Sequence, residues 1–141
     1  MLAAAALAAL LAGCTGEVNQ PAATLWEADI SGAGMPPSEL MGSLGAVSRA
    51  SGTEISISIT GAEPQAVHPW QIRTGSCGTA GQVFGAAPAY PDLHASNQGG
   101  ATVNTIVSRT LDEDGTYQVV VLQSPSVNEV IACGDLELAS F

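Results

Sequence analysis

Apolar and polar residues alternate along residues 54–60, and this two-residue period constrains the fold more than any other feature of the chain. Ile55, Ile57 and Ile59 fall on one side of an extended backbone, while serine and threonine fall on the other. No long apolar stripe at the helical period appears beyond residue 23. Residues 54–60 are therefore predicted to form a strand with one face on a core and the other in water.

Weaker versions of the same pattern predict further strands. They cover residues 25–31, 41–48, 68–73, 101–108, 117–122 and 130–138. Turn-forming residues separate several of them, and the acidic cluster at 112–115 is interpreted as a turn rather than as a calcium site. Residues 78–100, rich in Gly, Ala and Pro, are predicted to be one long loop. We therefore expect an all-β fold, an antiparallel Greek-key β-sandwich or barrel of about seven to eight strands, in one domain over residues 24–141.

The charge balance excludes partners that need basic residues. The chain has 13 acidic and 3 basic residues, with no lysine, and a formal net charge of −10. Binding to nucleic acid, or to anionic lipid through a basic patch, is therefore not expected. Hydrophobic residues make up 46% of the chain, far more than disordered chains carry, so a folded domain with a sizeable core is expected.

The chain begins with an uncharged apolar run, residues 1–13, directly before Cys14. As a helix it spans about 20 Å, which is too short for a bilayer core of about 30 Å. It is typical of a secretory signal, and its end, Leu11–Cys14, resembles the bacterial lipobox. The resemblance implies that residues 1–13 are removed, that acylated Cys14 enters a lipid bilayer, and that residues 14–23 are a tether. The expected location is the outer side of the bacterial cytoplasmic membrane, or the outer membrane. The alternative is a buried helix with Cys14 as a core thiol.

The chain has three cysteines, an odd number for an exported protein. If Cys14 carries lipid, Cys77 and Cys133 remain as a pair that oxidises outside the cytoplasm. A bridge across residues 77–133 would stabilise the fold by about 4 kcal/mol in the chain-entropy model. The alternative is two unpaired buried thiols.

Two cysteine-centred segments point to a family. Residues 68–78 read His-Pro-Trp-Gln-Ile-Arg-Thr-Gly-Ser-Cys-Gly, and residues 131–136 read Ile-Ala-Cys-Gly-Asp-Leu. The first resembles the metal-site strand of the Cu/Zn superoxide dismutase family, which leads to a disulfide cysteine. The second resembles that family's closing strand, which carries the partner cysteine. The resemblance covers roughly residues 22–141 and implies a superoxide-dismutase-like barrel closed by a Cys77–Cys133 disulfide.

The residues at the metal positions depart from that family. Gln71 and Arg73 stand where the resemblance places a pair of copper-binding histidines, and Leu122 or its neighbour Val121 stands at the later copper histidine. A glutamine amide is a poor ligand for a transition metal, and arginine has donors but no lone pair. The chain has two histidines in total, fewer than the dinuclear centre requires. We therefore expect no catalytic residue and no cofactor.

A single zinc or copper site is the alternative. Asp92 and His94 lie in the long loop, where the family keeps zinc ligands, and Asp135 or His68 is a remote candidate for a third ligand. The simpler interpretation is that Asp92 and His94 are solvated loop residues. Arg73 is expected to pair with an acid such as Asp135 or Glu129, or to line a remodelled ligand pocket.

These observations favour a cell-envelope lipoprotein whose degenerate, non-catalytic domain is a binding or structural module. Its protein or small-molecule partner is unknown. The alternative function is an enzyme of the superoxide dismutase family, or a metal-binding or carrier protein, with a metal site that the sequence does not reveal.

Overall fold

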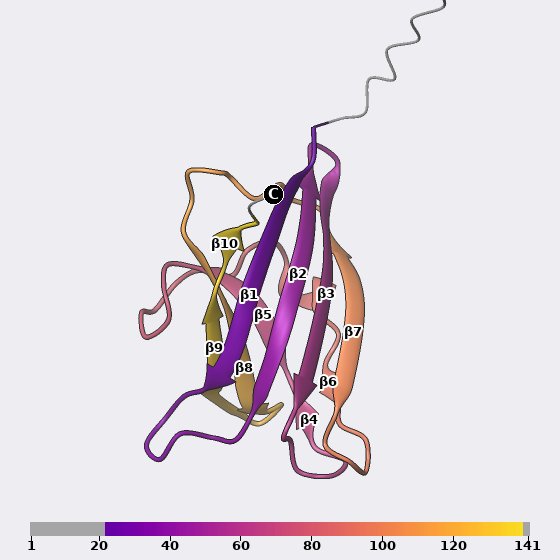
Figure 1. Cartoon of the computed structure of the whole chain (residues 1–141), viewed down its shortest axis with the longest axis vertical. Helices are drawn as coiled ribbons and strands as arrows, with labels where there is room; N and C mark the ends of the chain where they lie inside the picture. The colour runs from indigo at the N-terminus through magenta and orange to yellow at the C-terminus, as the bar shows by residue number, and fades with distance from the viewer. Residues whose placement is uncertain (1–21, 140–141) are drawn as a thin grey trace, which may run out of the picture.

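Antiparallel strands make up nearly all the regular structure of the described residues (Figure 1). The structure is a computed structural model that describes residues 22–139. The strands are β1 (Thr24–Gly32), β2 (Met41–Arg49), β3 (Gly52–Thr60), β4 (Val67–His68), β5 (Trp70–Thr74), β6 (Leu93–His94), β7 (Ala101–Val107), β8 (Tyr117–Ser124), β9 (Val127–Asp135) and β10 (Glu137–Leu138), with a short 3₁₀ turn, η1 (Ala87–Ala89). Residues 1–13, the tether residues up to 21, and Cys14 with its expected lipid lie outside the described residues.

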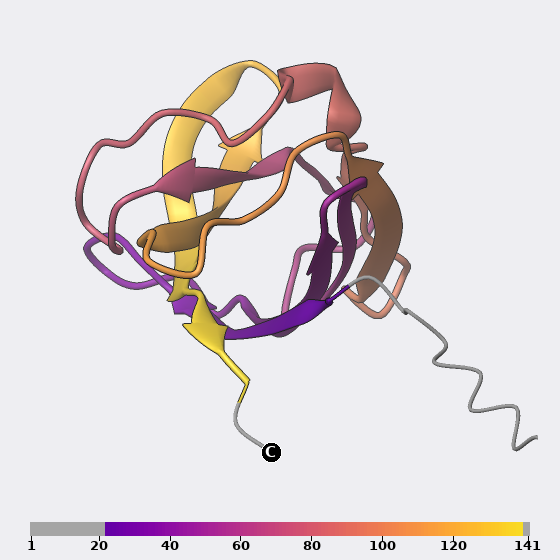
Figure 2. The ribbon, with the colours of Figure 1, turned by 90° about the horizontal axis from the view of Figure 1, so that it is seen from above.

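The large sheet curls into an open barrel. Its strands follow the order β5-β8-β9-β1-β2-β3-β7, with β10 paired to β1 and with β4 and β6 in a separate small sheet. Hairpins join β1, β2 and β3, whereas the connections from β3 to β5 and from β7 to β8 run between opposite ends of that order, as in Greek-key folds. Figure 2 shows the strands surrounding a common interior. The predicted all-β antiparallel fold is confirmed.

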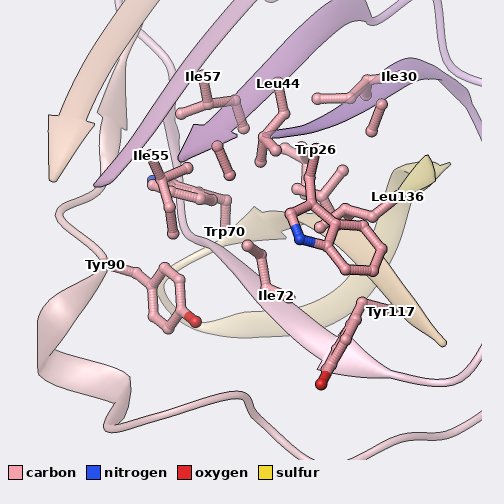
Figure 3. Packing of buried hydrophobic residues seen from close by; sticks show 14 of the residues in the cluster. Trp26, Ile30, Leu44, Ile55, Ile57, Trp70, Ile72, Tyr90, Tyr117 and Leu136 are labelled. Atoms are coloured by element: carbon pink, nitrogen blue, oxygen red, sulfur yellow. The ribbon is translucent and has the colours of Figure 1, made fainter. Parts of the chain in front are cut away.

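The core lies inside this barrel and uses the inward face of almost every long strand (Figure 3). Ile55, Ile57 and Ile59 are at most 2% exposed, so the alternation that predicted β3 is confirmed. The Trp26 ring meets the Tyr117 ring edge-on, with the ring centroids 5.6 Å apart. Such T-shaped contacts are favourable because a positive ring edge faces a negative ring face.

Strand β8 is buried on both faces, unlike the other long strands. Its inward residues belong to the main core, whereas Val120 and Leu122 form a second apolar cluster with Cys133. The partly buried Cys77 and Val130 pack against this second cluster. The loop after β5, which carries Cys77, therefore covers the outer face of β8.

Two strands that were predicted to be continuous are interrupted, and the residue at each break forms a hydrogen bond with β8. The strand expected over 68–73 divides at Pro69 into β4 and β5, because proline has no N–H to donate to a sheet. The Pro69 carbonyl instead accepts from the Leu122 N–H at 2.8 Å. The strand expected over 130–138 begins earlier, at Val127, and divides at Leu136, whose N–H donates to the Tyr117 carbonyl at 2.9 Å.

The stretch 78–100, predicted as one long loop, contains short structural elements. These are η1, β6 and an isolated bridge between Val83 and Arg73. The Phe84 N–H donates to the Ile72 carbonyl at 2.8 Å, which extends the pairing on the free edge of β5. Each element is too short to create a detectable sequence period. Among residues 22–139 no helix is long and apolar enough to cross a membrane.

Candidate functional site

Gln71 and Arg73 lie on the outward face of β5. Their neighbours Trp70 and Ile72 are 2% and 0% exposed and point into the core. Gln71 and Arg73 are each half-buried, because β5 alternates between the core and the outer side of the barrel. The polar residues at the first two copper positions of the resemblance therefore share one face.

The side chains of Gln71 and Arg73 bind each other. With its amide oxygen directed at Arg73, Gln71 accepts from Nε at 2.6 Å and from Nη2 at 2.5 Å. Burial lowers the pKa of the Arg73 guanidinium from its ordinary value. The expected pairing of Arg73 with Asp135 or Glu129 is wrong, because within residues 22–139 the only ion pair joins Arg49 to a different acid. The Asp135 carboxylate instead accepts from the Cys77 N–H at 2.8 Å.

Leu122 lies on the same outer face, on the strand next to β5. The register places Gln71 opposite Val120, and Leu122 packs with Val120 in the second apolar cluster. Leu122 is 8% exposed and has no atom that can coordinate a metal. The three expected copper positions therefore lie on one outer face of two neighbouring strands and hold a glutamine, an arginine and a leucine, although Arg73 pairs with Gln118, four residues from Leu122 along β8.

His68 is buried and its ring is already bonded. The register pairs it with Leu93, and both side chains are buried, at 7% and 0% exposure. Its Nδ1 lies 3.0 Å from the Leu122 carbonyl oxygen, within hydrogen-bond distance. This bond ties β4 to β8, so His68 has a structural position in the barrel.

Asp92 and His94 flank buried Leu93, so they lie on the side of β6 opposite to His68. Asp92 is half-buried and His94 is exposed. Asp135 is engaged with the Cys77 N–H, away from this loop. Within residues 22–139, no three or more His, Cys, Asp or Glu side chains come together as a metal site would require.

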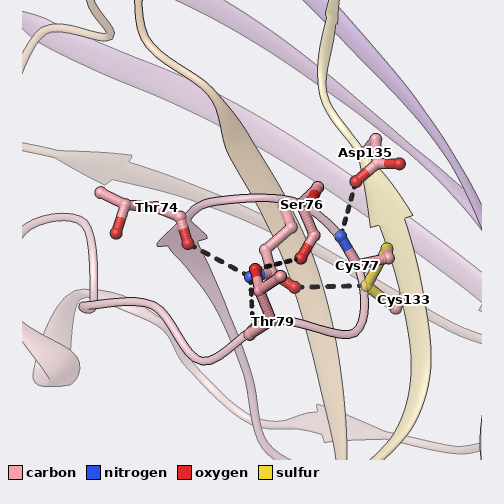
Figure 4. The surroundings of a disulfide bond; sticks show 7 residues. Thr74, Ser76, Cys77, Thr79, Cys133 and Asp135 are labelled. Carbon is pink, nitrogen blue, oxygen red and sulfur yellow. Dashed lines mark hydrogen bonds between the residues drawn. A yellow bond between two sulfur atoms is a disulfide. The ribbon is translucent and has the colours of Figure 1, made fainter.

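The Cys77–Cys133 disulfide joins the loop after β5 to β9, across the outer face of β8 (Figure 4). The cysteine Cα atoms are 5.9 Å apart, within the usual range for a disulfide. The predicted pairing of these two cysteines is confirmed, and the alternative of two buried thiols is wrong.

Gln118 is a structural residue at this site that the sequence analysis did not identify. It is 1% exposed, on the outward face of β8, and its amide nitrogen donates to the carbonyls of Thr74 and Thr79 at 3.2 and 3.1 Å. Its amide oxygen lies 3.5 Å from the Cys133 sulfur, which has no proton because it is oxidised. A lone amide at the start of the apolar run 117–122 is the signal that points to such a buried polar contact.

Comparison with known proteins adds no relative. No protein-family model matches the chain, and no curated protein sequence matches it. The residues and the geometry around β5, β8 and the disulfide therefore carry the functional interpretation.

Proposed function

We propose that this protein is an exported, lipid-anchored binding or structural module built on a degenerate superoxide-dismutase-like barrel without dismutase activity. The contact between Gln71 and Arg73, beside buried Leu122, carries this proposal. These residues occupy the positions where the resemblance places copper ligands. Arginine has no lone pair, leucine has no donor atom, and the glutamine oxygen is already engaged by the guanidinium.

The disulfide supports both parts of the proposal. The resemblance places a disulfide between a cysteine just after the metal-site strand and a cysteine in the closing strand, and Cys77 and Cys133 have these places. Structural disulfides belong mainly to proteins outside the reducing cytoplasm, which supports export. Export in turn is consistent with the lipobox-like sequence that ends at Cys14.

A metal-loading experiment tests the absence of a dismutase centre. The protein is incubated with copper and zinc, dialysed, and examined for metal by mass spectrometry and for superoxide dismutation. We expect traces of either metal and no activity. Stoichiometric copper or zinc in the unchanged protein would overturn the proposal, and Asp92 and His94 would then be the first positions to substitute.

A variant with restored imidazoles is the matched positive control. The triple substitution Gln71→His, Arg73→His and Leu122→His places three neutral nitrogen ligands on the face that these residues share. We expect this variant to retain copper after the same dialysis. If it folds, as judged by circular dichroism, and retains no copper, the assignment of these positions to the family's copper site is wrong.

The membrane anchor is tested separately through Cys14. The exported chain is expected to incorporate a labelled fatty acid and to fractionate with membranes, and Cys14→Ser is expected to abolish both. Membrane fractionation that persists in Cys14→Ser, without label in either protein, would contradict lipid anchoring.

A further inference from the structure

A groove of about 650 Å³ crosses the outer face of β1, β2, β3 and β7, the four strands that lie side by side in Figure 1. Its lining comes from all four strands: Leu25, Trp26, Glu27, Gly45, Ala46, Val47, Glu54, Ile55, Ser56, Asn104, Thr105 and Ile106. Sites for small molecules in proteins usually have volumes of about 300–1,000 Å³. The groove therefore has the size of a small-molecule site, and it lies over other strands of the large sheet than β5, which carries Gln71 and Arg73.

Gly45 forms the floor of the groove. It stands between Glu27 on β1 and Ser56 on β3 in the register of the sheet. A Cβ atom built on Gly45 meets no atom within 4 Å, and its φ is not among the positive values of the chain. Neither backbone strain nor a close neighbour requires glycine here. The missing side chain leaves open space in the middle of an outward face where other residues project.

Apolar side chains form a row along one side of this floor. Cross-strand pairing places Leu25 opposite Val47, Val47 opposite Glu54, and Glu54 opposite Ile106. Leu25 and Val47 are half-buried, and Ile106 is 64% exposed. Exposed apolar surface rimmed by polar residues is characteristic of binding sites.

The charged residues of the lining are both acidic. Glu27 forms no ion pair within residues 22–139, and Glu54 lies 3.6 Å from Arg49 in a solvent-exposed pair that contributes little. No arginine lines the groove, and the whole chain carries a net charge of −10. An apolar wall beside two carboxylates is complementary to a ligand that has an apolar body and a positive charge.

We propose that this groove binds a small cationic amphiphile. Its amine or quaternary ammonium group lies beside Glu27 and Glu54, and its apolar body lies over Gly45 against Leu25 and Val47. The inference rests on the proposed binding role, to which it adds a ligand class. The proposed function and the proposed ligand class can fail independently. Metal loading tests for a metal site on β5 and β8, whereas ligand titration tests for binding over β1, β2 and β3.

The test follows backbone amide resonances of the exported protein, carrying Cys14→Ser, during titration with octyltrimethylammonium below its micelle concentration. Octyl sulfate is the matched anionic probe with the same alkyl chain. We expect saturable shifts at Gly45, Ser56 and Ile106 with the cation, and affinity for the anion at least about fivefold weaker. Each exposed carboxylate contributes about two- to fivefold to such a difference.

Two variants and one control separate shape from charge. Gly45→Val fills the floor, and we expect it to weaken cation binding by at least about tenfold, since its side chain occupies the space of the alkyl chain. Glu27→Gln is expected to weaken binding by about two- to fivefold. Ser43→Val adds the same side chain on the same face of β2, outside the groove, and is expected to bind as the unchanged protein does.

Three results would overturn the inference. The first is equal affinity for the cationic and the anionic probe, and the second is binding that survives Gly45→Val. The third is a shift of the same amides with protein concentration alone, which would assign the groove to a second copy of this chain.

Discussion

Removal of the disulfide should strongly destabilise the protein. The bridge joins residues 56 positions apart, and the chain-entropy model gives about 4 kcal/mol for a loop of that length. We therefore expect Cys77→Ala with Cys133→Ala to lower the free energy of unfolding by about 4 kcal/mol. A domain of this size is typically stable by about 5–15 kcal/mol, so the variant loses a large share of its stability.

The loss should arise mainly in the unfolded state, because other contacts hold the loop in the native one. The Cys77 N–H donates to the Asp135 carboxylate at 2.8 Å, and Gln118 donates to the Thr79 carbonyl at 3.1 Å. Neither bond needs the disulfide. The native barrel should therefore persist, while the unfolded chain gains the freedom that the bridge had removed.

Urea unfolding measures this effect directly. Both tryptophans, Trp26 and Trp70, are buried in the core, so their fluorescence reports global unfolding. We expect a lower midpoint and a steeper dependence on urea, because an untethered unfolded chain exposes more surface. Reductant should destabilise the unchanged protein to a similar extent and leave the double variant unaffected. A loss of no more than about 0.5 kcal/mol, as for an ordinary surface substitution, would refute this reasoning.

Three further predictions concern buried contacts. Gln118→Ala should lower the free energy of unfolding by about 2–3 kcal/mol, because the buried amide and its two hydrogen bonds to the carbonyls of Thr74 and Thr79 are lost. Thermal unfolding checks this against the exposed control Gln123→Ala, and equal losses would contradict it. Burial raises the pKa of Tyr90 to about 12, so stability should fall as pH rises from about 10 to 12, where the unfolded chain loses a proton that the folded state keeps. Denaturation at several pH values should show a smaller fall in Tyr90→Phe, and an unchanged fall would assign it to another group. Gly134→Ala should destabilise the fold by about 1–3 kcal/mol, since its Cβ would lie 2.3 Å from a β1 carbonyl oxygen. Gly45→Ala, whose Cβ would meet no atom within 4 Å, should be tolerated in the same unfolding assay. Equal effects of the two substitutions would show that the space around each glycine does not set the cost.

The strength of the local pattern explains which strands were predictable. Ile55, Ile57 and Ile59 alternate with polar residues, and β3 has that alternation in its burial. The run 117–122 is continuously apolar after Gln118, which is typical of a strand buried on both faces, as β8 is. The break of β9 at Leu136 has no such signal, because it depends on the Tyr117 carbonyl of another strand.

The candidate site likewise has features that the sequence indicated and features that depend on contacts formed only after folding. The resemblance to the family's metal-site strand assigned Gln71 and Arg73 to one pair of copper positions, and the structure places both on the outer face of β5, opposite Trp70. The resemblance did not indicate that Arg73 binds Gln71 in place of an acid, because that choice depends on which side chains surround the guanidinium after folding.

The sequence by itself determined the fold class, the inward side of the clearest strands and the identity of the disulfide partners. The first two depend on alternation within a strand, which is local, whereas the disulfide partners follow from the assignment of Cys14 to lipid and from the resemblance of the segments around Cys77 and Cys133. Only the tertiary structure decided which faces lie side by side. Leu25, Val47 and Ile106 come from three strands, and pairing across β1, β2, β3 and β7 brings them into one row beside the empty position at Gly45. Strand register results from packing between distant segments, so a pattern within one segment does not contain it.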